Sequence, residues 1–286
     1  MEVNAKTVER LVRSALAEDV GAGDLTTEGL VPPEASCSGA LYLEEPGIVC
    51  GLHVVETVFK ILDPALVWQP EAREGDGPTT GSLARLSGRA RAILTGERTA
   101  LNLLGRLCGI ATLTRRYVDA VAGTGVTILD TRKTTPGLRA LEKYAVRCGG
   151  GVNHRFGLDD AILVKENHLR VAGGIAPAVA ALRNGRATKA ALVGGPAGRL
   201  LEVEAETLAE VEEALAAGVD RILLDNMTPT EVRRAVELTA GRAQTEASGG
   251  VTLETVRDYA GTGVDFISVG ALTHAARSLH VSLEIE

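Results

Sequence analysis

The chain has 286 residues, of which 45% are hydrophobic and only 3% aromatic. This content argues against disorder, and the length suits either two domains or one barrel with an appended domain. The formal net charge of −7 disfavours nonspecific nucleic-acid binding, which requires a basic surface. We therefore expect no nucleic-acid partner. No uncharged apolar run approaches the roughly 18 residues of a membrane span, so we expect no membrane partner either.

The first part of the chain mixes helical and strand-like patterns. Residues 4–18 have the apolar spacing of an amphipathic helix, and residues 21–35, rich in Gly, Pro and Thr, predict a loop. Strand-like runs broken by Gly and Pro fill residues 37–94, except for a helical period at 52–62. Residues 96–122 predict one long helix or two abutting helices. This half therefore predicts a mixed α/β domain.

The second part alternates short apolar strands with helices. This pattern predicts parallel strands joined by crossover helices, and six or seven such units favour a barrel over a short open sheet. The predicted strands include residues 127–132, 161–168, 199–206, 221–226, 242–250 and 266–271.

Polar residues end nearly every predicted strand of this second part. In β/α barrels the chemistry lies at the carboxyl ends of the strands, so these residues should converge on one rim. They are Asp130 to Lys133, Lys165 to His168, Glu204 and Glu206, Asp225 and Asn226, Glu246 to Gly250, and Gly270.

Basic residues are concentrated between residues 132 and 165 of this acidic chain. Guanidinium groups bind carboxylate or phosphate at two points, so several together indicate a polyanionic ligand. Arg132, Lys133 and Lys165 follow apolar strands directly and favour that interpretation. For Arg139 and Lys143, the alternative of a solvated helix face is the better one.

A glycine-rich run at residues 149–151 precedes His154 and Arg155. Glycines allow the backbone to approach a ligand closely, although loops in general contain many glycines. His154 is then either a structural residue or a hydrogen-bond partner of a ligand carboxylate.

Two acids, Glu204 and Asp225, end successive strands. Hard cations such as Mg²⁺ prefer oxygen ligands, so these carboxylates suit a magnesium–pyrophosphate site. Salt bridges to nearby lysines are an equal alternative. Glu202 and Glu206 share the strand face of Glu204, so spacing alone does not choose among the three.

Ser248, Gly249 and Gly250 precede a predicted helix over residues 252–263, a pattern typical of a phosphate-binding loop. Gly270, after the last strand, is placed to complete the site, since the last two loops of barrels recurrently bind phosphate. The alternative is that these are ordinary turn glycines.

Four cysteines, Cys37, Cys50, Cys108 and Cys148, have neither the spacing of a zinc knuckle nor that of a redox dithiol. We therefore expect reduced, buried thiols in a cytoplasmic protein.

Several stretches together resemble the quinolinate phosphoribosyltransferase family. The central one is DTRKTTPGLRALEKYAVRCGGGVNHR, followed in order by AILVKENH, LLDN, EASGG and DFISVGALTHA. Upstream, EDVGAGDLTT, EPGIVCG and GERTALNLLGRLCGIAT are also similar to the family, so the resemblance covers nearly the whole chain.

The resemblance implies the type II phosphoribosyltransferase fold. That fold has an N-terminal α/β sandwich, here 1–115, and an incomplete α/β barrel of about seven strands, here 116–274. The C-terminal segment 275–286 should return to the first domain. The resemblance also implies a homodimer in which Arg98 reaches the partner's active site.

Site residues carried over by motif fall into three groups. Arg98, Arg132, His154, Arg155 and Lys165 would bind quinolinate. Lys133 and Lys165 would flank pyrophosphate, while Glu204 and Asp225 would face the ribose hydroxyls and Mg²⁺. The 5′-phosphate of phosphoribosyl pyrophosphate would lie against Ser248, Gly249, Gly250 and Gly270.

The implied activity is phosphoribosyl transfer to quinolinate with decarboxylation, giving nicotinate mononucleotide. One alternative is a related transferase for another aromatic acid, although Arg98, Arg132 and Arg155 supply enough guanidiniums for two carboxylates. Another is a phosphosugar aldolase with Lys133 or Lys165 as its Schiff-base lysine. A non-enzymatic phosphometabolite-binding protein is the third.

Overall fold

The computed structural model describes residues 3–184 and 200–286. The chain forms two compact units. The first consists of Met1–Arg115, Lys133–Gly151 and Ala271–Glu286, and the second of Arg116–Arg132 and Val152–Gly270. Each unit is thus built from segments that are far apart in the sequence.

An antiparallel sheet in the order β10-β1-β3-β2 forms one layer of the first unit. Its strands are β1 (Ser36–Gly47), β2 (Val67–Pro70), β3 (Thr79–Arg89) and β10 (Val281–Ile285). β1 pairs with β3 on one side and with β10 on the other, where Leu41 lies opposite Leu283. The last strand of the chain is therefore an edge strand of this sheet and pairs with the first strand.

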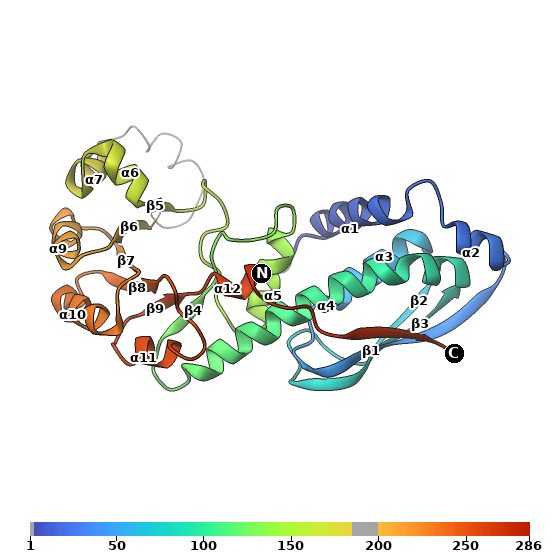
Figure 1. The fold of residues 1–286 in the computed structure, drawn as a ribbon. Coiled ribbons are helices and arrows are strands. Elements are labelled where there is room, and N and C mark those ends of the chain that lie inside the picture. Colours follow the sequence, from blue (N-terminus) through green and yellow to red (C-terminus); the bar gives the residue numbers. More distant parts are fainter. Residues whose placement is uncertain (1–2, 185–199) are drawn as a thin grey trace. The chain divides into compact units, whose positions relative to one another are not determined.

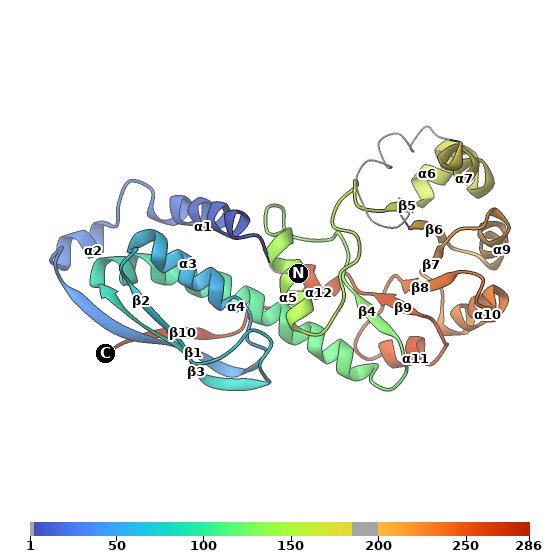
Figure 2. The same ribbon diagram turned by 180° about the vertical axis from the view of Figure 1, so that it is seen from behind.

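Helices α3 and α4 lie along one face of this sheet (Figures 1 and 2). Val54, Val55 and Phe59 of α3 are fully buried, which is the result of the helical period at 52–62. The helices of the unit are α1 (Ala5–Val20), α2 (Leu25–Leu30), α3 (Leu52–Leu62), α4 (Ala90–Ala120, which continues into the second unit), α5 (Arg139–Cys148) and α12 (Ala271–His274).

Three predicted boundaries in this half are wrong. The predicted loop contains α2, because the Asp24 carboxylate accepts a hydrogen bond from the Thr27 N–H at 3.0 Å and so caps a short helix. Residues 48–51, within the strand-like part, form no strand, and α4 begins directly after β3 at Ala90 rather than at residue 96. Buried strands and buried helices share the same apolar composition, so short runs do not distinguish them.

The second unit contains a parallel sheet in the order β4-β9-β8-β7-β6-β5. Its strands are β4 (Thr127–Leu129), β5 (Ile162–Val164), β6 (Leu201–Ala205), β7 (Arg221–Asp225), β8 (Gln244–Ser248) and β9 (Phe266–Ser268). Within the part of the chain that the structure describes, these are the six predicted strands. A single bridge between Leu129 and Val152 adds a further parallel contact beside β4. The parallel sheet with its crossover helices fits the predicted α/β barrel.

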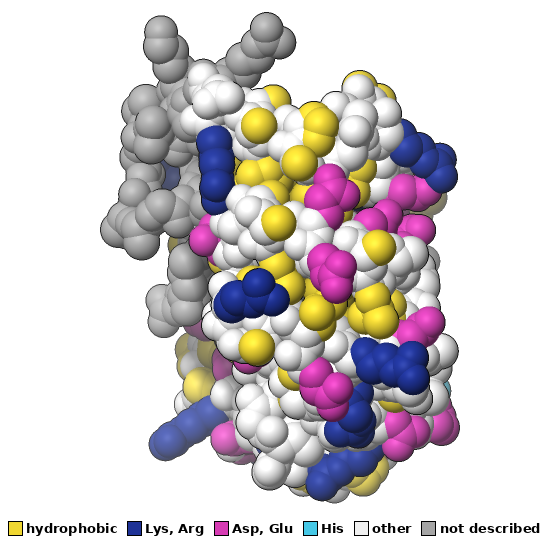
Figure 3. All heavy atoms as spheres, turned by 90° about the vertical axis from the view of Figure 1, so that its left-hand side faces the viewer, with side chains coloured by type: hydrophobic (Ala, Val, Ile, Leu, Met, Phe, Trp, Pro, Cys, Tyr) yellow, Lys and Arg dark blue, Asp and Glu magenta, His cyan; other side chains and the backbone are white. Residues whose placement is uncertain are grey.

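The crossover helices α9 and α10 pack on β6 and β8. Each begins at a threonine whose hydroxyl accepts from the backbone three residues on, and a glutamate at that position completes a capping box. The helices of this unit are α6 (Glu166–Ala172), α7 (Ile175–Arg183), α9 (Leu208–Ala217), α10 (Pro229–Thr239) and α11 (Val256–Ala260). Figure 3 shows acidic and basic side chains interspersed over the α9–α10 face, as expected for the solvent side of amphipathic helices.

Among the described helices, none combines the length and the apolar composition that crossing a membrane requires. The longest, α4 with 31 residues, carries several arginines along its length.

Candidate active site

The carboxyl ends of the parallel strands carry the polar residues singled out from the sequence. Lys165 follows β5, Glu204 lies near the end of β6, and Asp225 ends β7. Asp225 is paired in register with Ser248 at the end of β8. Because all the strands are parallel, these residues lie at the same edge of the sheet.

A close ion pair joins two of these strand ends. The Lys165 Nζ lies 2.5 Å from Oε2 of Glu204, whose side chain is 8% exposed while that of Lys165 is 49% exposed. The Glu166 N–H also approaches Oε1 of Glu204, at 3.5 Å. The salt bridge weighed as an alternative for Glu204 is therefore present, and it leaves the Lys165 ammonium open to solvent on one side.

Two further carboxylates lie close to that of Glu204. Oxygen atoms of Glu204, Glu206 and Asp225 lie within 4.8 Å of one another. The pKa of Glu206 is raised, first by desolvation and then by the neighbouring carboxylates. Mutual repulsion among oxygen donors at this spacing is relieved by a hard divalent cation, so the donor set fits Mg²⁺.

Asp130 positions the segment that follows the glycine run. Its side chain, in a fully buried residue, accepts from the His154 N–H at 2.8 Å and from the Asn153 amide at 2.7 Å. The Arg155 guanidinium donates to the Ala161 carbonyl at 3.2 Å. Burial lowers the pKa of Arg155, and the charge of Arg132 lowers it further. Arg132 and Arg155 are thus within electrostatic reach of each other, and two like charges so placed favour the binding of an anion nearby.

His154 belongs to a buried charged layer beneath these residues. Its Nε2 lies 3.1 Å from Glu202 and 3.6 Å from Glu246, and Arg221 contacts Glu246 at 3.1 Å. Burial alone would lower the pKa of His154, but the hydrogen bond to Glu202 and the two carboxylate charges raise it. Burial, then the charge of Glu202, raises the pKa of Glu246 to about 7. Within this structure the Nε2 of His154 therefore faces protein carboxylates.

The loop after β8 has the backbone freedom that close approach to a ligand requires. Gly249 and Gly250 have φ values of 93° and 63°. A Cβ added at Gly249 would collide with the Asn226 side chain and backbone nitrogen, while the Asn226 N–H donates to the Ser248 carbonyl at 2.8 Å. Only glycine fits at Gly249 without strain.

The helix predicted to open directly after this loop starts later than expected. α11 begins at Val256 rather than at residue 252, because Thr252 and Thr255 form a turn in which the Thr252 N–H donates to the Thr255 hydroxyl at 3.0 Å. An anion at Ser248 to Gly250 would therefore be bound by loop amides rather than by the N-terminus of a helix.

The first unit contains two of the predicted residues. Arg98 is exposed on α4, beside a surface depression of about 250 Å³ that is also lined by Ser278 to Val281. Lys133 is exposed, and its carbonyl accepts from the Thr273 hydroxyl at 2.7 Å. The expectation that Lys143 lies on a solvated helix face is wrong, since that residue is only 2% exposed.

Sequence reasoning placed Asp130 and Glu246 among the strand-end residues without giving either a role, did not select Arg221, and left Glu202 undecided. All four are charged residues at the ends of or within apolar strands, which is the signal that could have found them. Their pairing depends on which strands are neighbours, and strand order is not encoded locally.

Cations, carboxylates and a glycine loop at the carboxyl edge of a parallel β/α sheet define a barrel enzyme for an anionic, phosphorylated substrate. Two family models match this chain: the N-terminal domain of quinolinate phosphoribosyl transferase at residues 24–108 and its C-terminal domain at residues 110–284. The chain belongs to the quinolinate phosphoribosyl transferase family.

Individual relatives agree with this assignment. A probable nicotinate-nucleotide pyrophosphorylase [carboxylating] from Bacillus subtilis is 42% identical over 284 residues, covering 99% of this chain and 95% of the relative. The corresponding protein of Mycobacterium leprae is 43% identical, covering 96% and 95%. The solved structure of NadC from Streptococcus pyogenes has a TM-score of 0.92 and 39% identity, covering 100% of this chain and 99% of that one.

Proposed function

We propose that this protein transfers the phosphoribosyl group of phosphoribosyl pyrophosphate to quinolinate, with decarboxylation, in the de novo synthesis of NAD. The products are nicotinate mononucleotide, pyrophosphate and carbon dioxide. The observation that carries the proposal is the lysine–carboxylate pair and the glycine loop at one sheet edge, with two guanidiniums in electrostatic reach of each other, in a member of this family. An aldolase is disfavoured because the family assignment spans both domains.

Quinolinate would bind at the guanidinium side of the site. Its two carboxylates match the number of guanidiniums that Arg132 and Arg155 supply, since each guanidinium can donate two parallel hydrogen bonds to a carboxylate. Burial disfavours the charged form of His154, but Glu202 and Glu246 outweigh it, raise the pKa of His154 and so favour a positive charge there. These contacts would orient the pyridine nitrogen toward the sugar.

Phosphoribosyl pyrophosphate would occupy the lysine and glycine side. Lys165 and Lys133 would neutralise the departing pyrophosphate, and the loop amides of Ser248, Gly249 and Gly250 would hold the 5′-phosphate. Gly270 follows β9, the strand that neighbours β8, and would border the same phosphate.

Glu204 and Asp225 would bind Mg²⁺, directly or through the ribose hydroxyls. The support is the cluster of carboxylate oxygens within 4.8 Å, a donor set of the kind that this cation prefers. When bound, Mg²⁺ neutralises negative charge on the leaving pyrophosphate.

The reaction would proceed in two parts. The pyridine nitrogen forms a bond to the anomeric carbon of the ribose as the bond to pyrophosphate breaks. The ring then carries a positive charge, and it accepts the electron pair released when the 2-carboxylate leaves as carbon dioxide. The vacated ring carbon takes a proton. The protein's contribution is to hold both reactants in line and to stabilise the separating charges, so no covalent nucleophile is needed.

The decisive experiment incubates the protein with quinolinate, phosphoribosyl pyrophosphate and Mg²⁺ and follows carbon dioxide and nicotinate mononucleotide. Arg155→Ala should lose most of the activity, whereas Arg234→Ala, on the exposed side of α10, should keep it. Turnover of nicotinate without release of carbon dioxide would instead favour the alternative transferase. An equal loss in both variants would contradict the proposed site.

We also propose a homodimer with shared active sites, in which Arg98 enters the partner's site. The support is the exposed position of Arg98 on α4, beside a surface depression. Arg98→Ala and Lys165→Ala proteins should each be inactive, but mixing them after reversible dissociation should restore about one quarter of the wild-type sites. No recovery in a mixture shown to contain mixed dimers would contradict this arrangement.

A further inference from the structure

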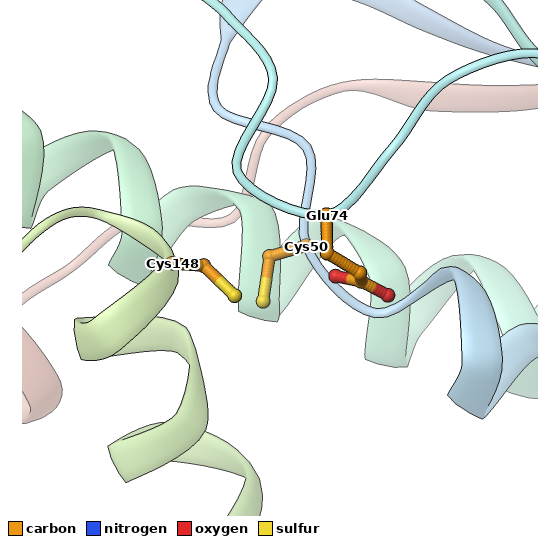
Figure 4. Close-up of side chains that lie close together, drawn as sticks. All are labelled: Cys50, Glu74 and Cys148. Atoms are coloured by element: carbon orange, nitrogen blue, oxygen red, sulfur yellow. The ribbon is translucent and has the colours of Figure 1, made fainter. Parts of the chain in front are cut away.

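Two cysteines that are 98 positions apart in the sequence meet in the first unit. Cys50 lies in the connection between β1 and α3, and Cys148 is the last residue of α5. Figure 4 shows the two sulfur atoms pointing toward one another, with the Glu74 carboxylate on the far side of Cys50. The ligand-type atoms of the three residues lie within 4.8 Å of one another. None of these residues takes part in the proposed reaction.

We propose that Cys50 and Cys148 form a reversible disulfide when the protein meets a hydroperoxide. The two thiols differ in the way this chemistry requires. Cys148 is partly exposed, so peroxide can reach it, whereas Cys50 is fully buried and can only react with a neighbour. Cys148 is therefore the attacking thiol and Cys50 the resolving thiol.

The surroundings of Cys148 favour its thiolate. Hydrogen bonds from Cys50 and from Tyr144, with the charge of Arg147, lower the pKa of Cys148 against the opposing effects of burial and of the Glu74 charge. Burial raises the pKa of Cys50 well above its ordinary value. A lowered pKa increases the thiolate fraction, and the thiolate is the form that attacks peroxide.

The reaction balances with peroxide as the sole oxidant. The Cys148 thiolate attacks one peroxide oxygen, the O–O bond breaks, and a sulfenic acid and hydroxide form. The Cys50 sulfur then attacks the Cys148 sulfur, the S–O bond breaks, and water leaves with the Cys50 proton. In total two thiols lose two electrons and hydrogen peroxide becomes two waters.

Cys108 is the competing partner, and its contacts argue against it. Its sulfur accepts from the Cys50 N–H at 3.3 Å and donates to the Cys50 carbonyl at 3.4 Å, so it faces the backbone of Cys50. Burial raises the pKa of Cys108 to about 12, which leaves almost no thiolate.

A metal held by the two sulfurs and Glu74 is the other use of such a cluster. The Glu74 carboxylate is already engaged: Oε2 accepts from the Gly51 N–H at 2.8 Å and Oε1 lies 2.9 Å from Nδ1 of His53. A metal would also require the fully buried Cys50 to ionise, whereas a disulfide is neutral and suits a buried position.

The test uses the Cys37→Ser variant, because one tryptic peptide, 14–60, carries both Cys37 and Cys50. The folded protein is treated with a small excess of hydrogen peroxide, alkylated, digested and analysed by mass spectrometry. We expect a link between peptide 14–60 and peptide 148–155, lighter by two hydrogens, about 2 Da. Free thiols should fall from three to one, and dithiothreitol should restore them.

A matched variant tests the order of the steps. In Cys50→Ser, Cys148 should still oxidise, and its sulfenic acid should be trapped by dimedone. A link from peptide 14–60 to peptide 107–115, which carries Cys108, would overturn the proposal. A Cys50–Cys148 link that forms only in denaturant would also overturn it. So would thiols that react with peroxide only after a chelator is added, since that would indicate a metal site.

Discussion

Replacing Glu246 with glutamine should make the stability of the second unit less sensitive to pH. Burial and the charge of Glu202 raise the pKa of Glu246 from 4.5 to about 7. Between these values the folded protein binds more protons than the unfolded chain, so stability falls as pH rises. One pKa unit is about 1.4 kcal/mol, so the loss is on the order of 3 kcal/mol.

His154 changes stability in the same direction. Its pKa is raised in the folded protein, so its contribution is full below the unfolded value of 6.5 and is lost as pH rises through the folded value. Removing one of its two carboxylate partners should reduce that contribution as well. The difference in unfolding free energy between wild type and Glu246→Gln should therefore shift against wild type as pH increases.

Urea unfolding followed by far-ultraviolet circular dichroism, from about pH 5 to about pH 8, measures this difference. Hydrogen exchange at the amides of β8 reports the second unit separately. Glu237→Gln, on the exposed side of α10, is the matched control and should run parallel to wild type at every pH. If Glu246→Gln also ran parallel to wild type, the buried layer would not hold a proton in the way the geometry implies.

Three further outcomes are expected. Arg132→Ala should raise KM for quinolinate by about 10- to 100-fold through loss of charge-assisted hydrogen bonds, with a much smaller change in KM for phosphoribosyl pyrophosphate. Equal changes in the two KM values, measured by steady-state kinetics, would count against the quinolinate site. Gly249→Ala should lower the free energy of unfolding more than Gly241→Ala. Both residues have a positive φ, which costs about 1 kcal/mol or more for alanine, but only Gly249 is also crowded by Asn226. Chemical denaturation of the two variants measures the difference. Chelation of divalent cations should stop product formation and Mg²⁺ should restore it, and Glu204→Gln should need more Mg²⁺ for half-maximal rate in a metal titration.

The barrel half of the fold was predictable because its signals are local. Each β-α unit consists of an apolar strand, a polar strand end and a capped helix within about 25 consecutive residues. The capping boxes at Thr207 and Thr228 and the left-handed Gly218 at the end of α9 are examples. The first half was harder, because α2 depends on one capping carboxylate and because Gly88, next to the β3–α4 junction, lies within β3 and does not separate it from α4.

The strand-end residues were predictable for the same reason, but their partners were not. Position after an apolar strand selected Lys165 and Glu204, and the structure joins them. The pairing of His154 with Glu246 requires knowing that β8 lies inside the sheet, two strands from β4. Such pairs are set by strand order, which emerges only from the packing of the whole sheet.

The contact between Cys50 and Cys148 was likewise not predictable from the sequence. The expectation of buried thiols is confirmed for Cys50 and Cys108 but is wrong for Cys37 and Cys148, which are partly exposed. Spacing shows no local dithiol motif, yet α5 brings Cys148 to the β1–α3 connection that holds Cys50.

α5 is held in the first unit by Glu142, a fully buried residue whose carboxylate contacts the Arg106 guanidinium of α4 at 2.8 Å. Because a buried ion pair is costly to break, Glu142→Gln should loosen α5 and slow formation of the Cys50–Cys148 link. Unchanged linkage kinetics, measured by the same peptide analysis, would show that the two sulfurs meet without this support.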